Sequence, residues 1–417
     1  MLSFETARAK VIEVVGARSG DPKSKLRTTE AIDLASDPSS ALGRVLATDI
    51  IADRNYPPFD RSIRDGFALR SGDAAEPGAR LRLIGESRAG FAFNSTVNTG
   101  ECVRILTGAP LPRGANAVMM HEYTRSEGDF VVFEQAARAG QHLVLAGAEA
   151  RVGEVLVARG ARLSYAELAV AAEVGQARIE VNRRPRVAIL STGDELVPLG
   201  EKPGPFQIRN SNNVSLAAQV TLAGGEPVLA GSALDDVAEL RARIERGLEA
   251  DMLILSGGVS VGKYDLVEQV LKELGAEIFF ESVAIRPGKP AVFGWCRGKP
   301  VFGLPGNPVS TMVTFELFVA PAVGMLCGHP PLPLPLFKAM LAHAVNEKGS
   351  VAHFLPARVS WPGQEFGLGP KVELVLWEGS GDIGAVVRGN CFLVVYPTRP
   401  GLEAGEWVDV FPRRGSL

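Results

Sequence analysis

The chain contains a short segment, LILSGGVSVGKYD at residues 253–265, whose residue types suit the binding of a phosphate group. Its two adjacent glycines would let the backbone approach an anion closely. Gly257, Gly262 and Lys263 also fit the G-x-x-x-x-G-K pattern of a nucleoside-triphosphate loop. However, that loop needs a serine or threonine hydroxyl at the next position, and this chain has Tyr264 there. The segment therefore predicts an anion-binding loop, and it does not favour hydrolysis of a nucleoside triphosphate.

Polar residues follow each of five apolar runs in the same part of the chain, residues 183–327. Because these runs are predicted strands of a parallel sheet, the polar residues would converge at its carboxyl edge, where open α/β sheets bind ligands. Glycine turns, helix N-termini, carboxylates and two cations would meet there, as a phosphorylated ligand requires, and the carboxylates could hold a divalent cation such as Mg²⁺. The five polar segments are Ser191-Thr192-Gly193-Asp194-Glu195, Asp235-Asp236, Ser256-Gly257-Gly258-Val259-Ser260-Val261-Gly262, Arg286-Pro287-Gly288-Lys289-Pro290 and Pro305-Gly306-Asn307-Pro308.

Each of these segments also has a purely structural interpretation. Asp236 with Glu239 matches a helix cap, and Asn307 with Pro308 matches the start of a helix. The glycine pair, the acids and the cations could equally be tight or solvated turns. Taken singly the segments are weak, and it is their predicted convergence that favours a ligand site.

The elements that would position these residues follow from hydrophobic spacing. The run RVAILS at residues 186–191 is typical of a buried strand, whereas residues 237–248 carry apolar side chains at helical spacing. Such strand and helix patterns alternate over residues 183–327, which predicts a doubly wound parallel sheet.

The flanking regions have different patterns. Residues 52–145 consist of short apolar runs separated by glycines and prolines, which predicts a β-rich domain, and the C-terminal region also has a β pattern. Helical patterns occur near the N-terminus and again shortly before residue 180, and the proline-rich run GHPPLPLPL at residues 328–336 predicts a linker. The predicted domains are residues 1–51 with 146–182 (helical and connecting), 52–145 (β-rich), 183–327 (α/β) and 328–417 (C-terminal β).

Composition limits the classes of partner and location. The net charge of -3 argues against a nucleic-acid binder, so a bound anion must be held by local groups. The four cysteines lie far apart without a C-x-x-C pair, and the five histidines lack a metal-binding spacing, so neither a zinc site nor a disulfide framework is predicted. The N-terminus does not resemble a signal peptide, and the most apolar stretch, residues 311–327, contains Glu316 and Pro321 and is shorter than a bilayer span. We therefore expect a cytoplasmic protein with no membrane or nucleic-acid partner.

Seven motifs, in this order, resemble the molybdopterin molybdenumtransferase family, known as MoeA in bacteria and as the gephyrin E domain in animals. The resemblance covers nearly the whole chain, including the proline-rich linker and the C-terminal β region. The α/β domain alone would be less specific, because molybdopterin adenylyltransferases and CinA-like proteins share it. The motifs are PPFDRSIRDGFAL, ILTGAPLPRGANAV, LSTGDELV, IRNSN, LSGGVSVGKYD, IRPGKPAVFG and GLPGNPVS.

The resemblance implies an enzyme that takes adenylylated molybdopterin and molybdate, inserts the metal into the dithiolene of the pterin and releases AMP. It implies Mg²⁺ as the assisting cation and a small β-barrel as the C-terminal domain. It also implies an elongated homodimer, with each site formed between the α/β domain of one chain and the β-rich N-terminal domain of the other. Transient contacts with the adenylyltransferase and with apo-molybdoenzymes would follow.

The resemblance also implies roles for individual residues. Five match acidic or polar positions that the family uses in catalysis, and the last three of these would hold the metal: Asp65, Thr107, Glu195, Asp235 and Asp265. Substrate would contact the glycine loops and their neighbours, namely Thr192, Gly193, Asp194, Ser211, Ser256, Gly257, Gly258, Ser260, Gly262, Arg286, Lys289, Pro305, Gly306, Asn307, Pro308 and Ser310. Among these, molybdate or a substrate anion would bind Ser211, Arg286, Lys289 and Ser310.

The chain departs from the family pattern at three positions. Arg64 replaces an apolar residue beside Asp65, where it could pair with that acid and lower its pKa, or bind an anion itself. Lys263 stands where an acid is common, which would weaken metal binding, and Glu149 stands where many members have aspartate. Three alternatives to the transferase stay open at this point: a paralogue that prefers tungstate, a non-catalytic molybdopterin carrier or scaffold, and a nucleotide-processing CinA-like enzyme. The CinA-like enzyme would lack the PPFD and LTGAP segments that are present here, and we expect no fused adenylyltransferase domain of the kind found in the scaffolding branch.

Overall fold

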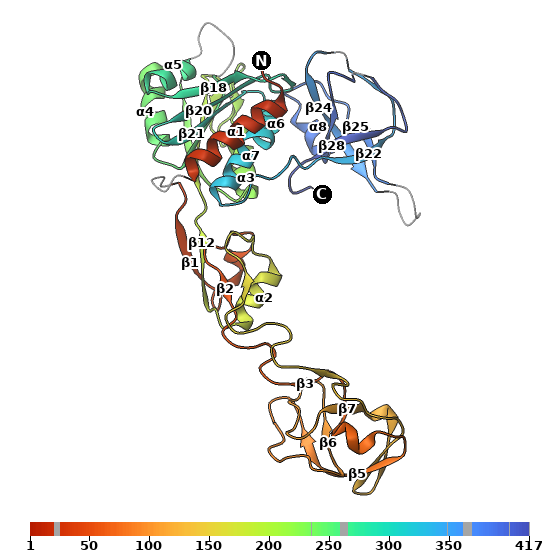
Figure 1. The fold of residues 1–417 in the computed structure, drawn as a ribbon. Coiled ribbons are helices and arrows are strands. Elements are labelled where there is room, and N and C mark those ends of the chain that lie inside the picture. The colour runs from red at the N-terminus through yellow and green to blue at the C-terminus, as the bar shows by residue number, and fades with distance from the viewer. Residues whose placement is uncertain are drawn as a thin grey trace. The chain divides into compact units, whose positions relative to one another are not determined.

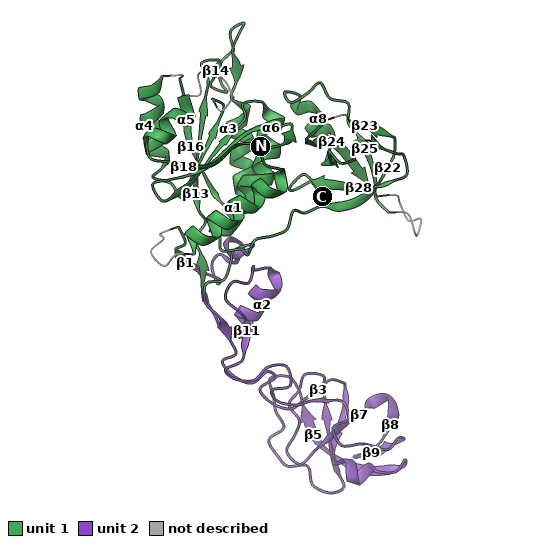
Figure 2. Cartoon of the chain, turned by 45° about the horizontal axis from the view of Figure 1, so that its top comes forward, with its two compact units in different colours: residues 1–31, 43–47, 180–417 green, residues 32–42, 48–179 purple. Residues whose placement is uncertain are grey.

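The structure is a computed structural model, and it divides the chain into two compact units. Figure 2 colours them: residues 1–31, 43–47 and 180–417 form the first unit, and residues 32–42 and 48–179 form the second. The described residues are 1–20, 26–234, 236–258, 266–347, 349–361, 369–399 and 401–416.

A six-stranded sheet forms the centre of the first unit, in the order β16-β13-β17-β21-β20-β18. The first four strands are parallel neighbours, as predicted. The prediction of an all-parallel sheet is wrong at β20, which runs antiparallel to both β21 and β18. The reason is local: β20 and β21 are joined by a tight turn around Gly298, too short for the crossover that a parallel pair needs. The strands are β13 (Arg186–Thr192), β16 (Glu226–Ala233), β17 (Met252–Ser256), β18 (Glu277–Ser282), β20 (Pro290–Cys296) and β21 (Lys299–Leu304).

Both faces of this sheet are covered by helices, so the doubly wound prediction is confirmed (Figure 1). Successive residues of a strand point to opposite faces. Thus Val187 and Ile189 of β13 pack with α1, α3, α6 and α7, whereas Ala188 and Leu190 pack with α4 and α5. The helices are α1 (Phe4–Ser19), α3 (Ser211–Leu222), α4 (Val237–Gly247), α5 (Leu266–Glu273), α6 (Pro308–Thr314) and α7 (Ala320–Leu326).

A π-helical turn, Phe315–Val319, joins α6 and α7 into one helical stretch of 19 residues, Pro308–Leu326. By length and hydropathy this stretch could span a membrane, but 83% of its apolar window is buried inside the protein, as in a core helix. Glu316 is buried within it. The charge is compensated because the carboxylate accepts hydrogen bonds from Gln219 and Arg414, each 3.0 Å long.

The C-terminal part of the first unit is a closed five-stranded β-barrel, as predicted. Its strands pair in the ring β24-β25-β22-β28-β26, which closes through β26 and β24. A short strand of the α/β region, β19 (Ile285–Arg286), pairs in parallel with β24 and ties the barrel to the loop after β18. The barrel elements are β22 (Phe337–Leu341), β24 (Ala352–Ser360), β25 (Lys371–Leu374), β26 (Cys391–Val395) and β28 (Trp407–Pro412), with α8 (Ile383–Arg388) and the pair β23 (Val345–Asn346) and β27 (Gly401–Leu402).

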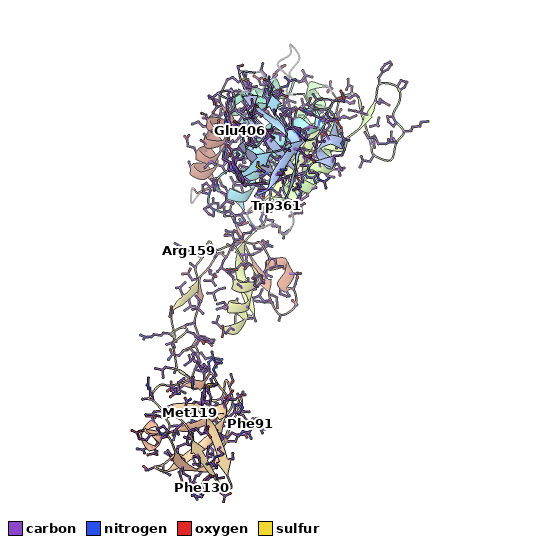
Figure 3. The ribbon with its side chains drawn as sticks, turned by 90° about the vertical axis from the view of Figure 1, so that its right-hand side faces the viewer. Phe91, Met119, Phe130, Arg159, Trp361 and Glu406 are labelled. Atoms are coloured by element: carbon purple, nitrogen blue, oxygen red, sulfur yellow. The ribbon has the colours of Figure 1, made fainter. Side chains whose placement is uncertain are left out.

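The second unit contains another six-stranded sheet, ordered β7-β4-β6-β5-β9-β8, which includes the labelled Met119 and Phe130 of Figure 3. Gly66 is the first residue of β4. A Cβ atom at Gly66 would lie 1.9 Å from the Met119 carbonyl oxygen, so only glycine allows β4 and β7 to pair there. Its strands are β4 (Gly66–Leu69), β5 (Ala79–Ser87), β6 (Glu101–Ile105), β7 (Ala117–Met120), β8 (Thr124–Glu127) and β9 (Phe130–Phe133).

Short elements make up the remainder. The predicted helix before residue 180 is α2 (Tyr165–Glu173), and it begins with a capping box between Ser164 and Glu167. The strand pairs are β1 (Thr29–Asp33) with β12 (Arg178–Asn182), β2 (Ile50–Ile51) with β11 (Val155–Val157), β3 (Arg61–Ser62) with β10 (Leu143–Val144), and β14 (Leu196–Val197) with β15 (Ile208–Arg209). The four predicted domain boundaries stay a prediction.

Candidate functional site

A pocket of about 450 Å³, here called the glycine-loop pocket, lies where β13, β17 and β21 end at the carboxyl edge of the first sheet. The starts of α3 and α6 also reach it, which places two helix N-termini at the pocket as an anion site requires. Three of the five predicted polar segments therefore converge here, together with Pro290 of a fourth, whereas Asp236 is not among the lining residues. The lining residues are Ser191, Thr192, Gly193, Glu195, Leu196, Ile208, Arg209, Asn210, Ser211, Asn212, Ser256, Gly257, Gly258, Pro290, Pro305, Gly306, Asn307 and Pro308.

Close packing of the chain explains the glycine pair after β17. Gly257 and Gly258 both have positive φ, at 92° and 62°. A Cβ atom on Gly257 would lie 2.5 Å from the carbonyl oxygen of Thr192, and one on Gly258 would lie 2.6 Å from the Thr192 hydroxyl. The two glycines thus let the ends of β13 and β17 meet. Gly306 is different, because a Cβ atom there would make only an ordinary 3.7 Å contact with Gly257.

Asn212 of α3 joins two of the strand ends, those of β17 and β21. Its side-chain amide donates hydrogen bonds to the Ser256 hydroxyl at 2.9 Å and to the Gly306 carbonyl oxygen at 2.8 Å. The nearby Ser191 hydroxyl donates to Asn213 at 2.6 Å. This network fixes the floor of the pocket, since α3 is held to β13, β17 and the turn after β21 at once.

Two buried oxygens of the pocket lining have no hydrogen-bond partner within the described residues: Thr192 Oγ1 and Asn212 Oδ1. Buried polar atoms are almost always satisfied in folded proteins, because leaving one unsatisfied costs about 1–3 kcal/mol. Both atoms belong to the residues that close the pocket floor. A ligand bound in the pocket, or a water molecule, would supply the missing partners.

A second pocket of about 480 Å³, here called the cation pocket, adjoins the first and shares Pro290 and Asn307 with it. It holds the predicted anion-binding residues Arg286 and Lys289, together with the buried Ser310. It is lined by Ile285, Arg286, Pro287, Gly288, Lys289, Pro290, Asn307, Ser310, Trp377, Glu378, Gly379, Ser380 and Gly381.

The two cationic side chains of this pocket have no partner among the described residues. Across the described parts of the chain, the side chains of Arg286 and Lys289 make no ion pair and no hydrogen bond, and both residues are exposed. Other arginines of this unit are paired with acids, for example Arg183 with Asp251 at 2.7 Å. Unpaired cations lining a concave surface attract anions, and an arginine can hold an oxyanion through two parallel hydrogen bonds.

The predicted helix start at Asn307 and Pro308 is confirmed. Asn307 occupies the N-cap position of α6, but its side chain does not cap the helix. Instead the amide donates a 2.9 Å hydrogen bond to the Ser380 hydroxyl, and the backbone N–H of Val309 donates to the Ser380 carbonyl oxygen at 3.0 Å. The barrel loop is thereby held against the start of α6. The predicted cap of α4 is also confirmed, because Asp236 accepts a 2.8 Å hydrogen bond from the N–H of Glu239.

The described residues supply one carboxylate for the expected metal. Glu195 lines the glycine-loop pocket, is exposed and folds back over Gly193, whose Cβ position is 2.5 Å from its Oε2. Asp194 is exposed and is not among the lining residues. The described part of the chain contains no group of three His, Cys, Asp or Glu side chains that could hold a metal. The other predicted ligands, Asp235 and Asp265, lie outside the described residues, as do Ser260, Gly262 and Lys263.

In the second unit, Asp65 and Thr107 form a hydrogen-bonded pair. The backbone N–H and the hydroxyl of Thr107 each donate to Asp65 Oδ1 at 2.7 Å. These two bonds hold the pKa of the Asp65 carboxyl below its ordinary value of 3.8, and the charges of His121 and Arg104 act in the same direction. Arg64 is exposed and is not one of the groups that lower this pKa. The hypothesis that Arg64 pairs with Asp65 is therefore wrong for the described residues, where Thr107 is the hydrogen-bond partner of Asp65. Glu149, the third departure, pairs with Arg61 at 2.5 Å.

Sequence reasoning missed two groups of lining residues. Asn210 and Asn212 stand in the motif IRNSN, from which only Ser211 was selected, and their amide side chains were the available signal. The barrel loop at residues 377–381 was not selected at all. Its sequence, WEGSG, is rich in glycine and polar residues, but nothing in the sequence indicates that this loop meets the α/β domain.

Comparisons with known proteins agree with this architecture. Residues 2–175 match the MoeA N-terminal region (domains I and II), residues 188–324 match a probable molybdopterin-binding domain, and residues 338–412 match the MoeA C-terminal region (domain IV). A molybdopterin molybdenumtransferase of Haemophilus influenzae is 34% identical over 414 residues, which are 99% of this chain and 98% of that protein. The chain belongs to the molybdopterin molybdenumtransferase family. The predicted family is confirmed.

Other members of the molybdopterin molybdenumtransferase family support the same conclusion. The enzyme of a Nostoc species is 39% identical over 323 residues, covering 76% of this chain and 73% of that protein. A crystal structure of the molybdopterin biosynthesis MoeA protein of Pyrococcus horikoshii superposes with a TM-score of 0.80 at 32% identity, covering 98% of this chain and 99% of that one.

Proposed function

We propose that this protein inserts molybdenum into molybdopterin: it takes adenylylated molybdopterin and molybdate as substrates, and releases AMP. The observation that supports this most directly is the junction of the glycine-loop pocket with the cation pocket. One offers glycine turns and helix N-termini to phosphate groups, and the other offers two unpaired cations to a second anion.

The two pockets would bind different parts of the substrates. The turns at Gly257 and Gly306 would hold the phosphate-bearing part of the pterin substrate, with Thr192 and Asn212 gaining partners from it. Arg286 and Lys289, with Ser310, would hold molybdate and offset its negative charge while the metal is transferred. Asp65, held in place by its two hydrogen bonds from Thr107, would serve as the proposed acid–base group.

Mg²⁺ is proposed as the assisting cation, where it would neutralise charge on the phosphoanhydride. Glu195 is the proposed ligand among the described residues, together with Asp235 and Asp265. One described carboxylate does not by itself make a magnesium site, so no step of the reaction is assigned to the metal. We also propose that the protein works in the cytoplasm as a homodimer, which sedimentation of the purified protein would test.

The direct experiment is release of AMP from adenylylated molybdopterin by the purified protein with magnesium, with and without molybdate. We expect release that depends on molybdate and is lost in Asp65→Ala. A parallel measurement with tungstate separates the two oxyanions. Tight binding of the pterin without release of AMP under either oxyanion would contradict the enzymatic function and leave a carrier.

A further inference from the structure

A third pocket, here called the barrel-side pocket, continues from the cation pocket. It has a volume of about 280 Å³ and shares Arg286, Trp377, Glu378 and Gly379 with its neighbour. The three pockets therefore form a series along the edge of the α/β domain and the barrel. The barrel-side pocket is lined by Arg286, Glu347, His353, Leu355, Trp377, Glu378 and Gly379.

Strand pairing brings the two sides of this pocket together. In the parallel pair of β19 and β24, Arg286 is in register with His353, so a residue of the α/β region lies beside a residue of the barrel. Trp377 packs against the hydrophobic clusters of both the α/β region and the barrel. Its ring is thus held in place by two cores before any ligand is present.

His353 carries an unsatisfied group. The residue is 3% exposed, and its Nδ1 has no hydrogen-bond partner within the described residues. The nearest acid is Glu347, whose Oε2 lies 3.0 Å from that nitrogen without the geometry of a hydrogen bond. A wholly structural histidine at this depth would be expected to have a partner, because an unpaired buried polar atom destabilises the fold.

The residue types suit a polar, flat heterocycle. A tryptophan face stacks on an aromatic ring, and a carboxylate accepts two parallel hydrogen bonds from an edge that carries two N–H donors. The side chain of Glu347 is 33% exposed, so it can reach a ligand while staying close to His353. A simple anion is a poorer occupant, since the second carboxylate of the pocket, Glu378, would repel it.

We propose that the barrel-side pocket binds the pterin ring of the substrate, with the amino and imide N–H groups of its 2-amino-4-oxo edge on Glu347 and its face against Trp377. This inference rests on the proposed function, because it assigns the ring end of the same substrate whose phosphate end occupies the glycine-loop pocket. The barrel thereby becomes the domain that recognises the heterocycle. Arg286, shared by two pockets, stands between the ring and the molybdate.

The test is direct binding of a fluorescent pterin probe, neopterin, followed by its fluorescence anisotropy. Its counterpart is a lumazine with the same side chain, in which an oxo group replaces the 2-amino group and the donor pair is lost. For the wild-type protein we expect lumazine to bind roughly tenfold to 100-fold more weakly than neopterin, as for the loss of a hydrogen bond to a charged group. Glu347→Gln should weaken the binding of neopterin by a similar factor, and it should remove the preference of the protein for neopterin over lumazine.

The matched control is Glu373→Gln, because Glu373 is an exposed acid of β25 that lines none of the three pockets. It should bind both probes like the wild type. Equal affinity of the wild type for neopterin and lumazine, equal affinity of Glu347→Gln and wild type for neopterin, or no binding of neopterin at all would each overturn the inference.

Release of AMP, measured on the same proteins, separates this inference from the proposed function. Wild-type protein that releases AMP normally while Glu347→Gln has an unchanged KM would refute the pterin pocket alone. Absence of molybdate-dependent AMP release from the wild type would refute the proposed function, whatever neopterin does. If both proposals hold, Glu347→Gln raises KM for adenylylated molybdopterin more than it lowers kcat.

Discussion

The first and second units each hold one group of the predicted functional residues. The two groups differ in whether their charged side chains have partners within the protein. In the first unit, Arg286 and Lys289 face pockets with no partner in the described residues. In the second unit, Asp65 already accepts two hydrogen bonds from Thr107. An unpaired charge is available to a ligand, whereas a satisfied carboxylate is held in one position and one protonation state. The first group is therefore suited to bind an anion, and the second holds a carboxylate in a fixed position.

The largest expected effect comes from closing the glycine-loop pocket. In Gly257→Ala the new Cβ atom would lie 2.5 Å from the Thr192 carbonyl oxygen, so β13 and β17 must separate at the pocket floor. We expect AMP release to fall by about 100-fold or more, because a displacement of about 1 Å at a reacting site has an effect of this size.

The control is Gly275→Ala, since Gly275 also has a positive φ, 79°, but has nothing within 4 Å of the Cβ position. It carries the backbone strain without the collision, and should lower the thermal midpoint while leaving AMP release near the wild-type value. Equal losses of activity in the two variants would mean that strain, not the contact with Thr192, explains the effect.

Removing an unpaired cation should have the next largest effect. Arg286→Ala is expected to raise the KM for molybdate roughly tenfold to 100-fold, the range for a hydrogen bond to a charged group. The thermal midpoint should change little, because the guanidinium has no partner within the described residues. Arg358→Ala, which removes an exposed arginine of β24 outside the three pockets, should leave KM unchanged. A loss of stability without a change in KM would show that Arg286 is structural.

Removing the hydroxyl donor of Thr107 should change the pKa of Asp65 in the second unit. Thr107→Val removes the hydroxyl donor but keeps the backbone N–H donor, so the pKa of Asp65 should rise toward its ordinary value of 3.8. We expect AMP release to fall roughly threefold to tenfold, less than for Arg286→Ala, because one of the two hydrogen bonds remains. Carboxyl carbon NMR of Asp65 over a pH titration measures the shift directly.

The sign of the accompanying stability change follows from the lowered pKa. The hydrogen bonds of Asp65 stabilise the fold at pH values above the ordinary pKa, and this contribution is lost as pH falls through the lower, folded-state value. The wild type should therefore exceed Thr107→Val in thermal midpoint at neutral pH and lose that advantage in acid. Thr221→Val, whose hydroxyl donates to the Ala217 carbonyl oxygen instead, should leave the Asp65 titration where it is. An unchanged Asp65 pKa in Thr107→Val would contradict the contrast drawn between the two units.

The smallest effect is expected where the barrel loop meets α6. Ser380→Ala removes the 2.9 Å hydrogen bond from Asn307, but the bond from the Val309 N–H to the Ser380 carbonyl oxygen remains. We expect about a twofold rise in KM for molybdate and a loss of about 1 kcal/mol in stability. Ser350→Ala, at an exposed serine of the same barrel, is the comparison. A KM change as large as that of Arg286→Ala would indicate that Asn307, once released, itself contacts the substrate.

The sequence alone carried the prediction of the glycine-loop pocket because periodicity is a local property. Runs such as residues 186–191 identify strands, alternation with helices makes neighbouring strands parallel, and parallel strands end at one edge. The place of Thr192, Gly257 and Gly306 in one pocket followed from that chain of reasoning, and the structure brings them together.

The tertiary structure alone decided which residues from distant segments lie at the carboxyl edge of the sheet. β20 reverses direction because its turn to β21 is short, and the pairing of Arg286 with His353 depends on β19 joining a strand of another domain. Whether Asp65 meets Arg64 or Thr107 likewise depends on the fold, since Thr107 is 42 residues away along the chain. Contacts between distant segments depend on which surfaces bury one another, and no local pattern of residues encodes that choice. The sequence by itself therefore determined which polar residues follow the strands and lie at one edge of the sheet. The tertiary structure decided which side chains of the barrel lie beside that edge.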